Sequence, residues 1–168
     1  MGYYVYDTDS EAKRLMESSL EVVQKLSECF GRDIYHNGRL NRGLLSSRVF
    51  GESDKIVLLN SIVHPVVRFD FYRWSESLNE EICFVESAIL YESRFDELVD
   101  EVWTVTAPEE LRIGRVRQRS GLTEEEIKKR MAAQLSEEEK QRRAAHIIWN
   151  DGNVSVIHRV LSLLKSLE

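Results

Sequence analysis

Residues 82–90 read ICFVESAIL, a stretch in which only Glu86 and Ser87 interrupt the apolar residues. A nearly continuous apolar run of this length is typical of a β-strand that is covered on both faces, as in a parallel sheet. A second run, VWTVT at residues 102–106, has the same character. The two runs therefore predict strands of a parallel sheet.

Helical segments separate these and other predicted strands along the chain. YYVY at residues 3–6 predicts an early strand, and Asp9 or Ser10 is a plausible cap for the helix that follows it. Apolar residues at helical spacing predict a helix over 20–30, which Gly31 ends. A last strand is predicted over 147–149, before a C-terminal helix whose apolar face carries Val154, Ile157, Val160, Leu161 and Leu164. This alternation predicts an α/β fold.

The middle of the chain predicts a helical insertion. Asn37-Gly38 predicts a turn, and Asn41 can cap a short helix through Phe50. A second helix is predicted over 53–63. The residue before a proline disfavours the helical region, so His64-Pro65 is expected to break or kink the chain before another helix over 66–78.

Three segments carry the Ser/Thr-x-x-Glu pattern of a capping box. They are Thr106–Glu109, Thr123–Glu126 and Ser136–Glu139. Each predicts the start of a helix, and Pro108 stands at an early helical position in the first of them.

Composition places the chain among ordinary soluble domains. Its 168 residues are 42% hydrophobic, which is enough for one domain with a real core. The net charge of -6 gives no support to nucleic-acid binding, which favours a basic surface. Cys29 and Cys83 lack the CxxC spacing of zinc sites and predict reduced, buried thiols. Without an apolar run of membrane-spanning length or a signal core, we expect a cytoplasmic protein without membrane contact.

Seven pieces of the chain match one family in order and at compatible spacing. They are VYDTD at 5–9, LNSIVHP at 59–65, ESAILYES at 86–93, VWTVTAPEE at 102–110, Arg115 and Arg119 before GLTEEE at 121–126, Gln134, and the turn Asn150-Asp151-Gly152. In these pieces the chain resembles the dephospho-coenzyme A (dephospho-CoA) kinases from end to end. Ala88 and Ala145 stand where the family pattern has proline and aspartate.

The resemblance implies a P-loop kinase fold, a three-layer α/β fold with a parallel sheet. The implied reaction moves the γ-phosphate of ATP, with Mg²⁺, to the 3′-hydroxyl of dephospho-CoA, which is the last step of coenzyme A synthesis. It also implies a single domain with three parts. These are a core of 1–32, 79–114 and 144–168, a helical CoA-binding insert of about 33–78, and a lid of about 115–143. Oligomeric state is not implied.

Asp9 is the candidate catalytic base. It matches the second aspartate of the family's strand-end DxD motif, which is proposed to act on the 3′-hydroxyl. A carboxylate just past the C-terminal end of a strand also lies where open α/β sheets bind ligands. A base beside the acceptor hydroxyl is a standard part of kinase sites. The alternative role for Asp9 is a helix N-cap.

Four residues are candidates for substrate binding. Asp7 is placed to orient water or metal, and Arg42 matches an insert arginine that would bind substrate phosphate or remain a surface charge. His64 stands in the family's His-Pro motif, where it would contact the CoA part of the substrate or stabilise a helix break. Glu86 interrupts an apolar strand, where burying a carboxylate without a partner is costly, and this favours a role with substrate or magnesium-bound water. Glu92 is a weaker candidate.

Five residues are candidates for ATP contact in the lid and beyond it. Arg115 and Arg119 are four residues apart, so they share a helix face. The resemblance places them against ATP phosphates, which planar guanidinium groups suit well. Lys140 and Arg143 would assist, and Asn150 begins the loop beside adenine. The alternative is that these cations pair with the glutamates of 124–126 and 137–139 on solvated helices.

The P-loop motif GxxxxGK[ST] does not occur in the 168 residues. In the family its backbone N–H groups and lysine cradle phosphate, and its hydroxyl holds magnesium. We therefore expect ATP binding and phosphoryl transfer by these residues alone to be near zero, and a natural start upstream of Met1. The family's central strand lies between those at 82–90 and 102–106, so we also expect two unpaired inner strand edges.

Two other functions remain open at this point. The first is a non-catalytic module that binds a CoA-type ligand or supports assembly. The second is a kinase for a different nucleoside or nucleotide, which the His-Pro insert disfavours through resemblance only.

Overall fold

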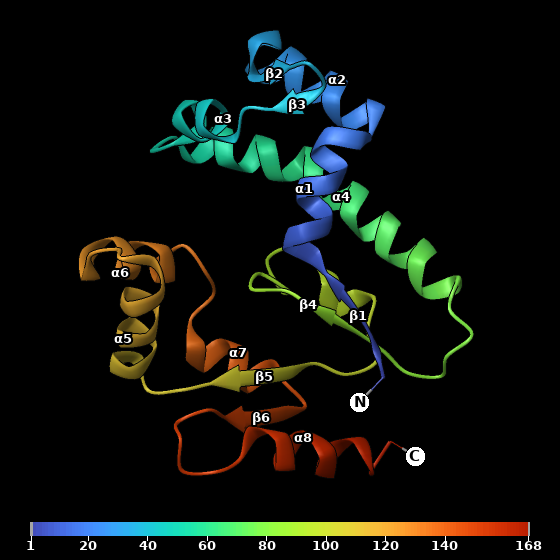
Figure 1. The fold of residues 1–168 in the computed structure, drawn as a ribbon, viewed down its shortest axis with the longest axis vertical. Helices are drawn as coiled ribbons and strands as arrows, with labels where there is room; N and C mark the ends of the chain where they lie inside the picture. Colours follow the sequence, from blue (N-terminus) through green and yellow to red (C-terminus); the bar gives the residue numbers. More distant parts are fainter. Residues whose placement is uncertain (1, 168) are drawn as a thin grey trace. The chain divides into compact units, whose positions relative to one another are not determined.

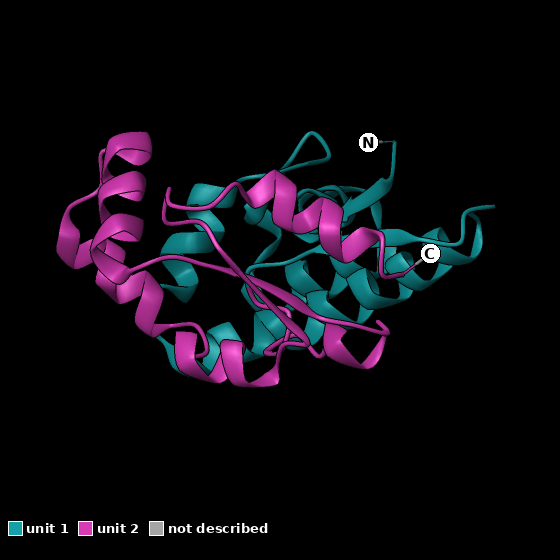
Figure 2. Ribbon diagram, turned by 90° about the horizontal axis from the view of Figure 1, so that it is seen from below, with its two compact units in different colours: residues 1–88 teal, residues 89–168 magenta. Residues whose placement is uncertain are grey.

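The computed structural model describes residues 2–167 (Figure 1). The chain divides into two compact units, Met1–Ala88 and Ile89–Glu168 (Figure 2). Each unit contains one pair of parallel strands together with its own helices. The α/β class and the parallel strand pairing expected from the sequence are confirmed, whereas the division into core, insert and lid stays a prediction.

Strand β1 (Tyr4–Asp7) pairs in parallel with β4 (Cys83–Glu86), from Tyr4 opposite Cys83 to Asp7 opposite Glu86. The early strand is therefore confirmed. β4 is shorter than the predicted strand over 82–90, because the chain turns after it. Backbone N–H groups of Ser93 and Phe95 donate to the carbonyls of Ile89 and Leu90, which keeps those residues out of a longer strand.

Helices α1 (Thr8–Ser18) and α2 (Leu20–Phe30) follow β1. The prediction that Asp9 or Ser10 caps the first helix is wrong, since Asp7 is the N-cap and accepts hydrogen bonds from the backbone N–H groups of both residues. The helix starts two or three residues earlier than expected, because the last strand residue is itself a short carboxylate with extended backbone. Gly31 ends α2 with φ of 93°, as predicted.

A 3₁₀ helix, η1 (Arg32–Ile34), leads into a small hairpin of β2 (Tyr35–His36) and β3 (Arg39–Leu40). The Asn37-Gly38 turn is confirmed, with positive φ at both residues, and it joins the two strands. Asn41 caps α3 (Arg42–Val49) through its side chain, also as predicted.

Helix α4 runs unbroken over Ser53–Glu76 with Pro65 inside it, so a break at His64-Pro65 does not occur, and the alternative of a kink there stays a prediction. A proline inside a helix costs about 3 kcal/mol. Buried residues lie on both sides of the proline at helical spacing, namely Ile62, Val63, Val67 and Phe71. Their packing against α1 and α2 outweighs the local preference.

In the second unit, β5 (Trp103–Thr106) pairs in parallel with β6 (His146–Trp149), from Trp103 opposite His146 to Thr106 opposite Trp149. The other elements are η2 (Phe95–Glu97), α5 (Glu109–Ser120), α6 (Glu124–Ala132), α7 (Glu137–Arg143) and α8 (Val156–Leu164). Both strands are confirmed. Helix α8 begins after Val154, so the prediction that Val154 lies on the apolar face of this helix is wrong, and Ile157, which was predicted on the same face, is exposed.

The helix starts in the second unit follow two of the three predicted capping boxes. Thr123 and Glu126 form a complete box at α6, and Ser136 caps α7. At α5 the predicted box is wrong, because Pro108 is the N-cap. Thr106 is still a strand residue there, and its hydroxyl accepts a hydrogen bond from Gln141 at 3.2 Å instead.

Both cysteines are free thiols. Cys83 is half-buried, but Cys29 is exposed, so the prediction of two buried thiols is wrong for Cys29. Within residues 2–167, every helix is too short or too polar to cross a lipid bilayer.

Replacing Gly31 tests whether the C-terminal end of α2 has room for a side chain. An added Cβ would lie 2.6 Å from Arg48 Nη1 and 2.7 Å from Asp33 Oδ1, and its backbone has positive φ. We expect Gly31→Ala to lower the free energy of unfolding by about 1–3 kcal/mol. Gly114→Ala is the matched control, since Gly114 lies inside α5 with open space around it and should gain about 0.5–1 kcal/mol. Equal effects in chemical denaturation would contradict this account.

Candidate active site

The C-terminal ends of β1 and β4 bring two carboxylates to one edge of the first unit. Asp7 and Glu86 are register partners at those ends. Asp9 follows two residues later, in the first turn of α1. Parallel sheets bind ligands beyond the carboxyl ends of their strands, so this acidic edge is the candidate site for the acceptor.

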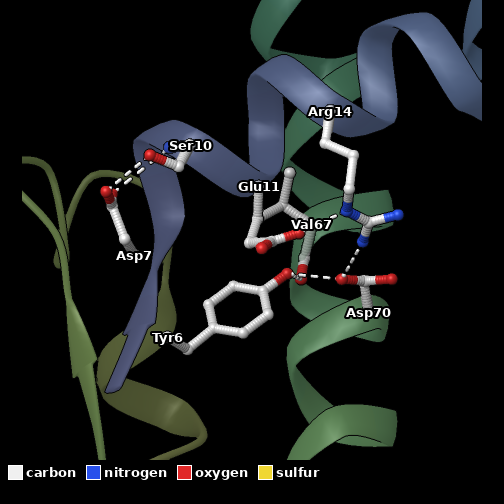
Figure 3. Close-up of polar contacts among 7 residues, drawn as sticks. All are labelled: Tyr6, Asp7, Ser10, Glu11, Arg14, Val67 and Asp70. Atoms are coloured by element: carbon white, nitrogen blue, oxygen red, sulfur yellow. Dashed lines mark hydrogen bonds and ion pairs between the residues drawn. The ribbon is translucent and has the colours of Figure 1, made fainter.

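Asp7 uses its carboxylate to hold the start of α1. Its Oδ1 accepts from the backbone N–H of Asp9 at 3.0 Å and of Ser10 at 3.2 Å, and its Oδ2 accepts from the Ser10 hydroxyl at 2.6 Å (Figure 3). The Ser10 hydroxyl is the main cause that lowers the pKa of Asp7, and the backbone N–H of Ser10 is the next. Asp7 is therefore an ionised, structurally engaged carboxylate.

Asp9 has a different environment from Asp7. Its side chain is 74% exposed and pairs with Lys13, one turn further along α1. The capping role that was the alternative for Asp9 belongs to Asp7. The carboxylate of Asp9 is thus available to a molecule that approaches this edge.

A partly buried network joins β1 and α1 to α4 (Figure 3). The Tyr6 hydroxyl donates to Asp70 Oδ2 at 2.7 Å, and Arg14 Nη2 donates to the same oxygen at 2.8 Å. Burial, followed by the bond to Asp70, raises the pKa of Tyr6 far above its ordinary value, so the phenol keeps its proton. Sequence analysis missed this network, because Tyr6 and Asp70 are 64 residues apart and no local pattern links them.

Arg42 and His64 lie elsewhere in the first unit. Arg42, in the first turn of α3, stands 3.4 Å from Glu17 Oε1 and is half exposed. His64, on α4, is half-buried, and desolvation lowers its pKa, so the imidazole is neutral at pH 7. Among the described residues neither makes a hydrogen bond with Asp7, Asp9 or Glu86, so the structure does not link them directly to the acidic edge.

In the second unit, Arg115 and Asn150 come together. Arg115 Nη1 donates to the backbone carbonyl of Asn150 at 2.7 Å, which ties α5 to the loop after β6. Arg119 is exposed one turn further along α5. Glu124 forms an ion pair with Lys128. Glu124 therefore does not provide the glutamate partner that was the alternative role for Arg115.

Lys140 and Arg143 lie on α7 beside the segment that follows β4. Lys140 donates to Gln134 Oε1 at 3.0 Å. The Arg143 guanidinium lies over the Tyr91 ring, 4.8 Å from its centroid, and its Nε is 3.2 Å from Glu139 Oε1. For Arg143 the predicted alternative of glutamate pairing is therefore realised.

Two further polar groups gather at α7. The Tyr91 hydroxyl is buried without a hydrogen-bond partner within residues 2–167, which leaves a donor for a water or ligand atom. Glu92 accepts from the backbone N–H of Leu135 at 2.6 Å and so holds the turn between α6 and α7. No sequence pattern pointed to a role for the Tyr91 hydroxyl, and Glu92 was only a weaker candidate for substrate binding.

The described residues contain no ready-made metal cluster. No three His, Cys, Asp or Glu side chains within residues 2–167 gather in a metal-binding arrangement.

Comparison with known proteins identifies the family. A family model described as "CoaE: Dephospho-CoA kinase" matches residues 1–155. The chain belongs to the dephospho-CoA kinase family. It is 35% identical to the dephospho-CoA kinase of Porphyromonas gingivalis over 168 residues, covering 99% of this chain and 83% of that protein. It is 39% identical to the dephospho-CoA kinase of Salinibacter ruber over 162 residues, covering 94% and 81%.

Two solved structures have a fold similar to that of this chain. A crystal structure of a Thermus thermophilus protein has a TM-score of 0.84 and 33% identity, covering 98% of this chain and 84% of that one. The dephospho-CoA kinase from Campylobacter jejuni has a TM-score of 0.70 at 24% identity, covering 99% and 88%. The second likeness, at its lower identity, speaks to the fold alone. The resemblance read from the seven sequence pieces is confirmed.

Ser10→Ala tests the cause of the low Asp7 pKa. Loss of the hydroxyl should raise that pKa toward the ordinary aspartate value, as followed by carboxyl ¹³C NMR across the acidic range. In the native chain the lowered pKa stabilises the fold above the unfolded-state pKa, and this stabilisation fades as pH falls through the folded-state value. Ser19→Ala, which removes the cap of α2, is the control and should leave the Asp7 titration unchanged. An identical Asp7 titration in Ser10→Ala would refute the assignment.

Proposed function

We propose that the function of this chain is transfer of the γ-phosphate of ATP to the 3′-hydroxyl of dephospho-CoA, with Asp9 as the base. Because GxxxxGK[ST] does not occur in its 168 residues, turnover is expected from a longer product of the reading frame. The assignment of Asp9 rests on the different environments of the Asp7 and Asp9 carboxylates. Asp7 is engaged by α1, whereas Asp9 is exposed at the C-terminal end of a parallel strand. A base in that position meets the ligand-binding edge of the sheet.

In the proposed reaction the 3′-oxygen attacks the γ-phosphorus while its proton passes to the Asp9 carboxylate. The bond between the γ-phosphorus and the β,γ-bridging oxygen breaks, and ADP leaves with the electron pair. Lys13, on the next turn of α1, orients the Asp9 carboxylate before the substrate arrives. Asp7 fixes the backbone from which Asp9 projects.

The remaining candidates of the first unit are assigned to the acceptor. Arg42 is proposed to bind a phosphate group of dephospho-CoA, which would compete with its weak contact to Glu17. His64, neutral because of its burial, is proposed to contact the CoA part as a hydrogen-bonding group without charge. Glu86 is proposed to contact the substrate or a magnesium-bound water from the end of β4.

The candidates of the second unit are assigned to ATP. Arg115, Arg119, Lys140 and Arg143 would meet its phosphates, and the loop that begins at Asn150 would lie beside adenine. The contact of Arg115 with the Asn150 carbonyl supports this grouping, because it places a guanidinium next to the proposed adenine loop. Mg²⁺ is proposed to arrive with the nucleotide, where it would neutralise charge on the phosphates. A cytoplasmic location is part of the same proposal.

The central test replaces the proposed base. In the longest product of the reading frame, Asp9→Asn should lower kcat by about 10²–10⁴-fold and leave KM for ATP nearly unchanged, because only proton transfer is lost. Release of ADP and the mass of the CoA product measure turnover. Asp54→Asn is the matched control, since Asp54 is an exposed aspartate in the first turn of α4. Equal rates for the Asp9 and Asp54 variants would remove Asp9 from the chemistry.

The same assay separates the proposed enzyme from the binding module. It is run on the 168-residue chain and on the longest product of its reading frame, in parallel with calorimetric titration of dephospho-CoA. Turnover by either protein supports the kinase function, and turnover by the longer product alone agrees with the expected need for a P-loop. Binding of dephospho-CoA without turnover by either protein would favour the non-catalytic module.

A further inference from the structure

We propose that Asp70 of α4 is a positioning residue for the segment Asp7–Asp9, because it holds both the strand that enters this segment and the helix that leaves it. This proposal rests on the proposed function, in which Asp9 is the catalytic base. Two hydrogen bonds to one carboxylate oxygen of Asp70 support its positioning role.

A single oxygen of Asp70 accepts from both flanks of the segment (Figure 3). The Tyr6 hydroxyl donates to Oδ2 at 2.7 Å, and Tyr6 is the residue immediately before Asp7. Arg14 donates to the same oxygen at 2.8 Å from α1, five residues after Asp9. Movement of the segment relative to α4 must therefore stretch one of these two bonds.

The Tyr6 side of this arrangement is rigid. The Tyr6 side chain is 3% exposed, and its ring lies against Phe71 and Trp74 of α4, each with a centroid distance of 5.3 Å. The hydroxyl also lies 3.4 Å from the Val67 carbonyl, one turn before Asp70. Because the phenol keeps its proton and Asp70 carries the charge, the bond between them is charge-assisted.

The Arg14 side supplies orientation. Arg14 Nε donates to Glu11 in the preceding turn of α1, so two carboxylates hold its guanidinium. An ion pair this exposed contributes little to stability alone. The ion pair between Arg14 and Asp70 instead sets the rotation of α1 about the helix axis. It thereby sets the side of the helix toward which Asp9 projects.

The Asp7 cap lies between these two anchors. Asp7 ties the backbone N–H groups of Asp9 and Ser10 to the end of β1. Because Tyr6 and Arg14 are both hydrogen-bonded to Asp70 of α4, the backbone of Asp9 is restrained on both sides. A base that must meet a hydroxyl group requires such a fixed origin, since small misplacements at a reacting centre cost large factors in rate.

The test compares variants that keep the packing of Tyr6. Tyr6→Phe removes only the hydroxyl, and Asp70→Asn removes the charge that Arg14 and Tyr6 share. Glu76→Gln, at an exposed carboxylate near the end of the same helix, is the control. We measure kcat, KM, and amide hydrogen exchange at Asp9 and Ser10 compared with amides inside α2.

We expect Tyr6→Phe and Asp70→Asn each to lower kcat by about 10–100-fold with KM for ATP unchanged. The double variant should lose no more than the worse single variant, because both act through one oxygen. The amides of Asp9 and Ser10 should exchange faster, while those inside α2 keep their wild-type rates.

Two results would overturn the proposal. One is kcat values equal to that of Glu76→Gln, and the other is faster exchange of equal size throughout the chain, which indicates general destabilisation. If neither the 168-residue chain nor the longest product of its reading frame turns over, the proposed function fails and hydrogen exchange alone decides. Faster exchange confined to Asp9 and Ser10 then supports the positioning role, and unchanged exchange rejects it.

Discussion

The parallel pairing of β1 with β4 is the constraint on which the candidate acceptor site depends. Its register brings Asp7 and Glu86 to the same end of the sheet, although they are far apart in the sequence. Because the strands are parallel, both chains leave the sheet in one direction, and the residues that follow them share one edge. A shift of one residue would end the pairing of Asp7 with Glu86 and turn the Asp7 side chain to the other face of the sheet.

The two neighbouring aspartates show how one local sequence yields two different roles. Asp7 and Asp9 differ in position by only two residues, yet one is fully engaged by hydrogen bonds and the other is exposed. The helix start decides between them, because the carboxylate that precedes a helix captures its free N–H groups. The strand-end position thus supplies one structural carboxylate and one that is available for chemistry.

Local patterns in the sequence predicted much of this fold, and non-local packing explains the remainder. The Asn37-Gly38 turn, the Asn41 cap and the Thr123–Glu126 box were predictable because each depends on neighbouring residues. The continuity of α4 through Pro65 was not, because burial of residues on both sides of the proline overrides a local preference. The Tyr6–Asp70 bond was also beyond prediction from local pattern, since its partners lie in different elements. For the candidate site, the resemblance supplied the residues, and the structure supplied the division between Asp7 and Asp9.

The most direct test of the central claim is an NMR titration of the labelled chain with dephospho-CoA. Backbone amide shifts locate the ligand without requiring ATP or turnover. If the acidic edge binds the acceptor, shifts should appear at residues 7–10 and at Glu86, at the C-terminal ends of β1 and β4, with smaller shifts around Arg42 and His64. Shifts confined to residues 109–150 would contradict it, because the acceptor would then bind the unit that we assign to ATP.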